Sequence, residues 1–155
     1  MSRSKIADEI RQTRPFSSPQ EEVIIALLRT VDVVRSRKSP AFDAAGLTQQ
    51  QYNVLRILRG AGPQGLPTLE IGERMIERTP GITRLIDRML KKGLVERERC
   101  TEDRRVVYAR LTRTGRKLVD SLDEPIREMN KSALGKLRKK DCAPLLELLD
   151  RIREG

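Results

Sequence analysis

Apolar residues recur three or four positions apart along most of this chain, which is the spacing of amphipathic α-helices. The pattern predicts helices in five segments: residues 18–38, 47–62, 69–76, 80–92 and 141–153. A further long helix is expected to start at Thr112, and Pro125 inside it should kink or break it. Residues 1–17 are polar and are expected to form an arm or a short helix. The sequence therefore predicts a mainly helical protein.

Residue types at the predicted helix ends support this interpretation. Two helices open on a capping box, formed by Ser18 with Glu21 and by Thr48 with Gln51. The first of these helices is expected to end near Lys38, because Pro40 follows. In the second helix, the residues expected to be buried are Val54, Leu55 and Leu58.

Two short helices, Leu69–Ile76 and Pro80–Lys92, are joined by a tight segment and have the lengths of a helix-turn-helix. We expect Thr68 and Thr79 to cap them and Gly93 to end the second. The inward-facing residues should be Leu69, Gly72, Met75 and Ile76 in the first helix and Ile82, Leu85, Ile86 and Met89 in the second.

The second short helix would present polar residues opposite its buried stripe: Thr83, Arg84, Asp87, Arg88 and Lys91. Thr and Arg near a helix N-terminus suit the DNA major groove, where Arg can donate two hydrogen bonds to guanine or neutralise a phosphate. An ordinary amphipathic surface helix would show the same pattern. This helix alone therefore does not decide between the two interpretations.

A small β-hairpin is predicted directly after that helix. Two alternating runs, Leu94–Arg99 and Val106–Leu111, flank the charged loop Cys100–Arg105. A two-stranded ribbon is marginally stable alone, so it should lean on the helices. A charged hairpin after such a helix is typical of the wing of a winged helix. Its tip would reach a minor groove through Arg104 and Arg105, with Asp103 orienting an Arg by a charge-assisted hydrogen bond.

The charge of the chain is concentrated in the same region. The 155 residues carry a formal net charge of +10, and residues 84–117 hold 12 Lys or Arg against 5 Asp or Glu, a net charge of +7. This excess favours an anionic partner such as nucleic acid. A solvated surface usually mixes the two signs, as residues 118–155 do. Aromatic residues make up only 3% of the chain and Trp is absent, so a large platform for stacking bases is not expected.

Several other classes of function find little support. There is no His, and the two cysteines, Cys100 and Cys142, cannot complete a zinc site, so neither a metal nor another cofactor is expected. No phosphate-binding loop or nucleophile elbow occurs, and we expect no enzyme activity. No stretch has the length of a membrane span, and residues 1–14 lack the apolar core of a secretion signal. A cytoplasmic location is therefore expected.

The sequence resembles the MarR family of bacterial transcriptional regulators from about Leu47 to Glu154. The resemblance is strongest in "ITRLIDRMLKKGLVERERCTEDRRVVYARLTRTGR", Ile82–Arg116, where the order T-R-L-[IV]-D-R, K-K-G-L-V-x-R, D-R-R and L-T-x-x-G is specific to that family among winged helices. Gly72 departs from the family, which usually has Ala there. The resemblance implies a mainly α fold with a small β-hairpin wing (α+β), in which a winged helix-turn-helix lobe is joined to N- and C-terminal dimerisation helices.

The resemblance also implies an organisation and a function. Residues 1–17 would be an N-terminal arm, 18–40 and 112–155 the dimerisation helices, and 47–111 the DNA-binding lobe. The protein would be a homodimeric regulator, expected to be a repressor, that binds a pseudo-palindromic operator in double-stranded DNA and is released by a small aromatic ligand. Recognition-helix positions fall on Thr79, Gly81, Thr83, Arg84 and Arg88, and wing positions on Asp103 and Arg105, beside Arg104.

Three points stay open at this stage. Tyr52, Asn53 and Arg56 would border the family's ligand pocket, although Tyr52 could simply pack within the lobe. Cys100 lies among arginines that could activate its thiol for redox sensing, or it is a spectator at a strand end. The lobe could also serve as a protein-interaction module without a ligand response, but such a wing should lose its basic tip.

Overall fold

The computed structural model describes residues 5–78 and 80–154 and divides them into two compact units, which meet between Lys38 and Ser39. The first unit contains helix α1 (Lys5–Glu9) and most of helix α2 (Pro19–Ala44). The expected start of α2 is confirmed, because the Glu21 N–H donates to Ser18 Oγ over 3.1 Å. The carboxylate of Glu21 accepts its hydrogen bonds from Ser17 and not from Ser18, so the predicted reciprocal capping box does not form.

Helix α2 ends later than the sequence predicted. It continues past Lys38 to Ala44, with Pro40 inside it. The reason is burial: Phe42 is only 5% exposed and its ring lies 5.1 Å from the ring of Tyr52, centroid to centroid. The apolar contact made by this last turn outweighs the backbone hydrogen bond that Pro40 removes.

Glycine then ends α2 in a Schellman motif. The Leu47 N–H donates to the Phe42 carbonyl over 2.9 Å, and the Gly46 N–H donates to the Asp43 carbonyl over 3.0 Å. Gly46 has a φ of +64°, in the left-handed region that this motif requires. The next residues turn at once into helix α3 (Gln49–Ala61), whose capping box between Thr48 and Gln51 is confirmed.

Helices α4 (Thr68–Glu73) and α5 (Ile82–Lys91) form the helix-turn-helix, but both are shorter than predicted. The N–H of Ile76 donates to Asn53 Oδ1 over 2.8 Å, which takes that residue out of α4. Gly81 has a φ of +99°, a value that excludes it from α5. Eight residues, 74–81, therefore separate the helices in place of the three, 77–79, that the predicted bounds left between them.

The predicted inward face of α4 is partly wrong. Leu69 and Ile76 are both 77% exposed, whereas Ile71 is fully buried and Met75 is buried as predicted. Thr68 is the first residue of the helix, and its hydroxyl donates to the Val107 carbonyl, so it does not act as the cap. The register changes because this hydroxyl ties the start of α4 to the sheet, which turns Ile71 toward the core.

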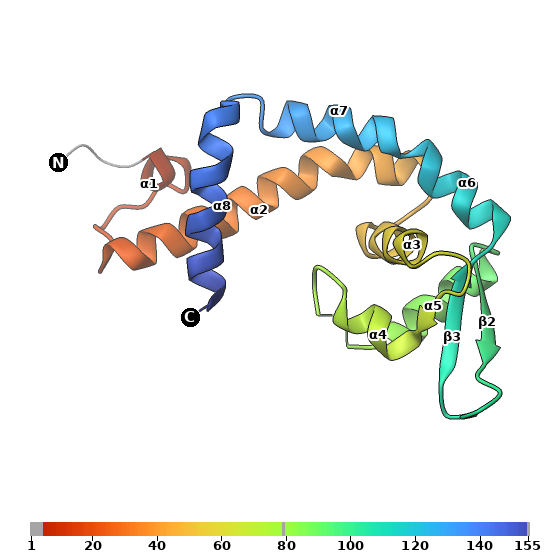
Figure 1. The fold of residues 1–155 in the computed structure, drawn as a ribbon. Helices are drawn as coiled ribbons and strands as arrows, with labels where there is room; N and C mark the ends of the chain where they lie inside the picture. Colours follow the sequence, from red (N-terminus) through yellow and green to blue (C-terminus); the bar gives the residue numbers. More distant parts are fainter. Residues whose placement is uncertain (1–4, 79, 155) are drawn as a thin grey trace. The chain divides into compact units, whose positions relative to one another are not determined.

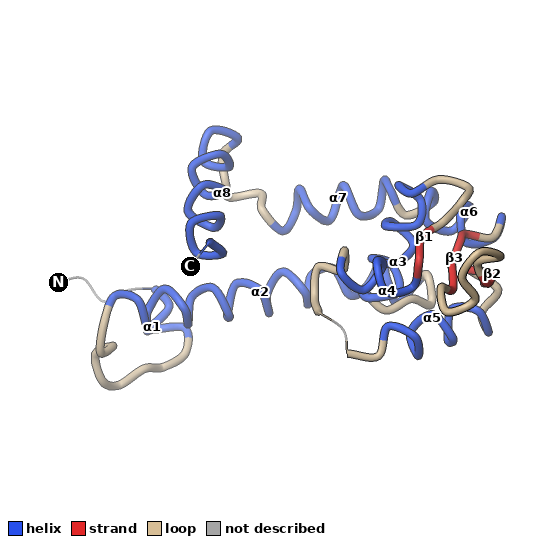
Figure 2. Tube along the Cα trace, turned by 60° about the horizontal axis from the view of Figure 1, so that its bottom comes forward, coloured by secondary structure: helices blue, strands red, loops and turns tan. Residues whose placement is uncertain are grey.

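The sheet has a third strand that the sequence did not predict. The hairpin strands β2 (Val95–Arg99) and β3 (Val107–Leu111) pair in antiparallel fashion, and β1 (Leu66–Pro67) pairs with the other edge of β3 (Figures 1 and 2). A strand of two residues is too short to show alternation. At Gly65, just before β1, φ is +69° and a Cβ would collide with the Ala109 carbonyl, so this close approach requires glycine.

The C-terminal helices are α6 (Arg113–Ser121), α7 (Asp123–Ala133) and α8 (Lys139–Glu154). The break predicted from Pro125 is confirmed: it falls at Leu122, which leaves Pro125 in the first turn of α7, where its missing N–H has little consequence. Thr112 caps α6 by accepting the Gly115 N–H over 3.0 Å.

The core lies where α3, α4, α5, the sheet and α6 meet. Its fully buried large side chains include Leu55, Leu58, Ile71, Leu85, Ile86, Met89 and Val119. The elements form a mainly α protein with a small antiparallel sheet, as the sequence predicted, and the order α3–α4–α5–hairpin is a winged helix-turn-helix. Among the described residues, no helix is long and apolar enough to cross a membrane.

Candidate nucleic-acid interface

Helix α5 separates its two faces cleanly. The predicted stripe of Ile82, Leu85, Ile86 and Met89 is buried. The opposite side exposes Thr83, Arg84, Arg88 and Lys91. Within the described ranges, none of these three cations forms an ion pair, so their charges are available to an anion outside the protein.

The start of α5 has an open backbone. Gly81 precedes the helix in a left-handed conformation, and an added Cβ would meet no atom of the described residues within 4 Å. The space around Gly81 would therefore admit another molecule close to the first turn of the helix. Thr79, also predicted to contact DNA and to cap α5, lies outside the described residues.

The hairpin turn is ordered by Asp103. Its Oδ1 accepts the Arg105 N–H over 2.9 Å, and its carbonyl accepts the Val106 N–H over 3.0 Å. Asp103 therefore holds the backbone of Arg105, whereas the expected charge-assisted hydrogen bond would have oriented an Arg side chain. Arg104 and Arg105 are exposed in the turn between β2 and β3. Figure 1 shows this turn at the end of the hairpin farthest from α6.

Two arginines of the sheet are committed to partners inside the protein. Arg110 on β3 pairs with Glu98 and, over 3.7 Å, with Glu96, both on β2. Arg97 on β2 pairs with Asp87 of α5 over 2.7 Å. The positive charge of residues 84–117 that remains unpaired among the described residues is thus on α5 and just after it, at Arg99 at the end of β2, at the hairpin turn and on α6.

A basic pocket of about 650 Å³ adjoins the exposed face of α5. It opens between the end of α2, the start of α3 and the second half of α5, and its cationic lining residues are Arg88, Lys91 and Lys92. Lys92 donates to the Gly46 carbonyl over 2.6 Å and to Gln51 Oε1 over 3.3 Å. Lys92 therefore links the end of α5 to the end of α2 and the start of α3, while Arg88 and Lys91 extend the positive surface of α5.

The three residues predicted to border a ligand pocket differ in their surroundings. Tyr52 is only 7% exposed and packs against Phe42, and this burial raises the pKa of its hydroxyl. Asn53 is half-buried, and its side-chain oxygen accepts the N–H of Ile76 in the segment after α4. Arg56 is exposed beside them on α3. Tyr52 and Asn53 thus have structural contacts within one protomer.

Both cysteines are free thiols. Cys100 is half-buried at the end of β2, where its N–H donates to the Val106 carbonyl over 2.9 Å, and Cys142 is exposed on α8. In the described part of the chain, no group of three or more His, Cys, Asp or Glu side chains is arranged to hold a metal ion.

Two arginines that form ion pairs inside the protein, Arg59 and Arg97, were not predicted from the sequence to do so. Arg97 follows Val95 at the two-residue period of β2, so it lies on the inward face of the sheet, and a charged residue at such a position is the available signal. Arg59 is half-buried in the last turn of α3 and gives no comparable signal, because its partners Asp120 and Asp123 lie more than 60 residues away in the chain.

Comparison with known proteins places these features among DNA-binding regulators. The MarR family model matches residues 47–107. The crystal structure of a MarR transcription factor from Planctomyces limnophilus is 40% identical, covers 88% of this chain and 98% of its own, and has a TM-score of 0.69. The homoprotocatechuate degradative operon repressor of Escherichia coli is 27% identical over 84% of this chain and 86% of its own. The crystal structure of NadR in complex with 4-hydroxyphenylacetate is 25% identical over 90% and 97% of the two chains, with a TM-score of 0.70.

Proposed function

This chain belongs to the MarR family of transcriptional regulators, and we propose that it is a repressor that binds a pseudo-palindromic operator as a homodimer. Its relatives in the comparisons are regulators and not enzymes. The repressor assignment is supported by the E. coli relative, which is named as the repressor of an operon. Binding to the chromosome implies a cytoplasmic location.

The proposal rests on one observation. Helix α5 and the hairpin that follows it each expose arginines that form no ion pair among the described residues. Helix α5 exposes Arg84 and Arg88 opposite its core stripe, and the hairpin that follows exposes Arg104 and Arg105 at its turn. We assign α5, with Thr83 and the open backbone at Gly81, to the major groove. The hairpin turn would enter the flanking minor groove, where the negative potential favours Arg.

Homodimer formation is supported by apolar surface that one protomer leaves exposed. On α2 these residues are Val23, Ile24, Leu28 and Val31, and on α8 they are Leu145, Leu146, Leu148 and Ile152. No residue of α8 is buried, although its apolar positions follow a helical period. Exposed apolar surface of this extent marks an interaction site, and a second copy is the partner that a pseudo-palindromic operator requires. Half-sites should lie about 10 base pairs apart.

We further propose that a small aromatic ligand releases the protein from DNA. The NadR structure, in which a related protein holds 4-hydroxyphenylacetate, supports this assignment. Arg56 is an exposed cation next to Tyr52 and Asn53 and suits the carboxylate of an aromatic acid. The ligand would favour a dimer whose two α5 helices no longer match the half-site spacing.

Fluorescence anisotropy on the DNA upstream of the protein's own gene tests the proposed function. Wild type, Arg84→Ala, Arg105→Ala and the control Arg127→Ala are titrated over a salt series. Arg127 is exposed on α7 and pairs with Glu124, so its removal changes the net charge equally but lies outside α5 and the hairpin. We expect Arg84→Ala to erode the preference for the specific site and Arg105→Ala to weaken binding, with Arg127→Ala equal to wild type.

The same titration can overturn the proposal. Weak, sequence-independent binding by the wild type, unchanged in both α5 and hairpin variants, would mean that the basic region is ordinary surface. The lobe would then be better explained as a protein-interaction module.

A further inference from the structure

The side chain of Arg97 joins the hairpin to helix α5 by two contacts. Its Nη1 lies 2.7 Å from Asp87 Oδ1, and its Nη2 donates to the Thr83 carbonyl over 3.1 Å. Both partners belong to α5, one turn apart, whereas Arg97 is the central residue of β2. The guanidinium therefore fixes both the rotation and the position of the first turns of α5 relative to the strand.

The surroundings of Arg97 distinguish it from an ordinary surface ion pair. Its side chain is 27% exposed, and its Nε is buried without a hydrogen-bond partner in the described part of the chain. The residue directly opposite on β3 is Ala109, which is fully buried. Leaving a buried donor unpaired is unfavourable, and an apolar side chain of similar volume would avoid that loss. Stability alone therefore does not account for an arginine here.

We propose that Arg97 is a positioning residue that couples helix α5 to the wing, so that their two sets of DNA contacts form as one unit. The inference rests on the proposed function. Thr83 is the neighbour of Arg84, and β2 leads from Arg97 to the turn that carries Arg105. Once one of these two arginines is engaged on DNA, the tie through Arg97 holds the other at its groove. The entropy of orienting the second element is then already lost.

A double-mutant cycle measures this coupling directly. Operator affinity is determined for Arg84→Ala, Arg105→Ala and the double variant in three backgrounds: wild type, Arg97→Met and Arg110→Met. Arg110 is the matched control, because it is 31% exposed and loses an equivalent ion pair, but its partners Glu96 and Glu98 lie within the hairpin.

The coupling should depend on Arg97 alone. In the wild-type and Arg110→Met backgrounds, the combined loss should be smaller than the product of the single losses by about 5-fold or more. In the Arg97→Met background, the affinity loss of the double variant should equal the product of the two single losses to within about 2-fold. Arg97→Met itself should lower operator affinity by about 10-fold and leave binding to unrelated DNA within about 2-fold, since phosphate contacts are retained.

Each outcome bears on the inference. Circular dichroism and thermal unfolding establish that Arg97→Met is folded, and Asp87→Ala, which removes the same ion pair from the helix side, is measured in parallel. Coupling that persists in both folded variants would overturn the inference, as would loss of the fold in both, which would make Arg97 a stability residue. If wild type lacks a specific site, the proposed function fails first, and the inference fails with it. If wild type binds a specific site but the coupling between Arg84 and Arg105 persists in the folded variants, only the inference about Arg97 fails and the proposed function stands.

Discussion

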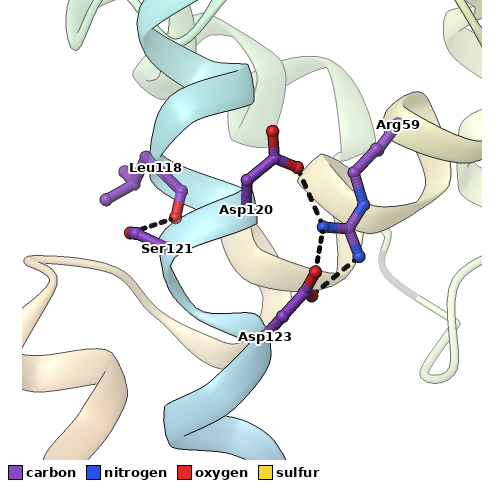
Figure 3. A network of polar contacts seen from close by, with 5 residues as sticks. All are labelled: Arg59, Leu118, Asp120, Ser121 and Asp123. Carbon is purple, nitrogen blue, oxygen red and sulfur yellow. Dashed lines mark hydrogen bonds and ion pairs between the residues drawn. The ribbon is translucent and has the colours of Figure 1, made fainter.

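Arg59 on α3 donates a hydrogen bond of 2.9 Å to each carboxylate oxygen of Asp123 on α7, and its Nη1 also donates to Asp120 over 3.0 Å (Figure 3). Asp120 lies in the last turn of α6 and Asp123 is the first residue of α7, on either side of the break at Leu122. One guanidinium therefore fastens the junction between the two helices to the core helix of the winged lobe. The bidentate geometry makes this stronger than an ordinary surface pair.

Replacing Arg59 should loosen that junction. We expect Arg59→Ala to lower the free energy of unfolding by about 1 kcal/mol, because the contact is bidentate but only partly shielded from water. Urea denaturation measures the change. Arg127→Ala, which removes an i,i+3 pair with both side chains more than 60% exposed, is the control and should be neutral. Equal effects for the two variants would show that the Arg59 network adds no special stability.

The same contact predicts a dependence on acid. The hydrogen bond from Arg59 holds the pKa of Asp123 below its ordinary value of 3.8. Because the folded-state pKa is lower than the unfolded one, the carboxylate stabilises the fold above the unfolded pKa and loses that effect as pH falls through the folded pKa. Asp123→Asn should therefore be less stable than wild type at pH 7, and the difference in stability should shrink as the pH falls below 3.8 and through the lowered folded-state pKa. A difference that stays constant as acid is added well below pH 3.8 would refute the linkage.

Asp103 provides a test in which charge and hydrogen bonding predict opposite results. Removing a negative charge beside phosphates should strengthen DNA binding, but Asp103→Ala also removes the acceptor of the Arg105 N–H. We expect the lost hydrogen bond to dominate and to weaken operator binding by about 3-fold. Asp103→Asn keeps an oxygen at the same place and should bind within about 2-fold of wild type. Tighter binding by Asp103→Ala would show that Asp103 acts only through its charge.

Two glycines should respond in opposite ways to the same substitution. At Gly115, a Cβ would collide with the Leu94 carbonyl, so Gly115→Ala should destabilise the protein by about 2 kcal/mol. At Gly60 on α3, a Cβ would meet no atom of the described part of the chain within 4 Å, and Gly60→Ala should stabilise the protein by roughly 0.5 kcal/mol. Thermal unfolding of the two variants gives both signs. A neutral Gly115→Ala would mean that the corner between β3 and α6 can shift.

The basic pocket beside α5 predicts a change in salt dependence. Lys91 lines it and has no ion pair among the described residues, so it is suited to a phosphate of the DNA backbone. Lys91→Ala should reduce the slope of log affinity against log salt by about 1, equally on specific and unrelated DNA. Lys131→Ala, which removes an exposed cation paired with Glu128 on α7, should leave the slope unchanged. An unchanged slope for Lys91→Ala would place the pocket outside the contact with DNA.

Local rules were sufficient for several features whose signal lay within a few residues. The capping box of Thr48 and Gln51, the buried stripe of α5 and the break before Pro125 were all predicted correctly. Each depends on hydrogen bonding or steric limits between neighbours in the chain. The motif L-T-x-x-G is explained by the structure in the same way, since Thr112 caps α6 and Gly115 admits the Leu94 carbonyl.

Most of the errors arose where distant segments decide the local structure, whereas the capping box expected from Ser18 and Glu21 failed locally because the Glu21 carboxylate accepts from Ser17. Phe42 extends α2 because it packs against Tyr52, and Ile71 replaces Leu69 in the core because the sheet holds the start of α4. Of the candidate site, the exposed face of α5 and the hairpin turn were predictable from periodicity and charge. The ties of Arg59 and Arg97 were not, because nothing local indicates which carboxylate a long cationic side chain will meet after folding.

The alternating charges of β2 have a consequence for the behaviour of the protein at high concentration. The outer edge of this strand is unpaired in the sheet, and an open edge invites another chain to add a strand. Here the exposed side chains of the edge strand are Glu96, Glu98 and Arg99, so an approaching strand would have to strip water from a row of ionic groups. At the opposite edge, β1 is two residues long and ends in Pro67, which offers no N–H. The hairpin can therefore stand out from the lobe without becoming a template for polymerisation.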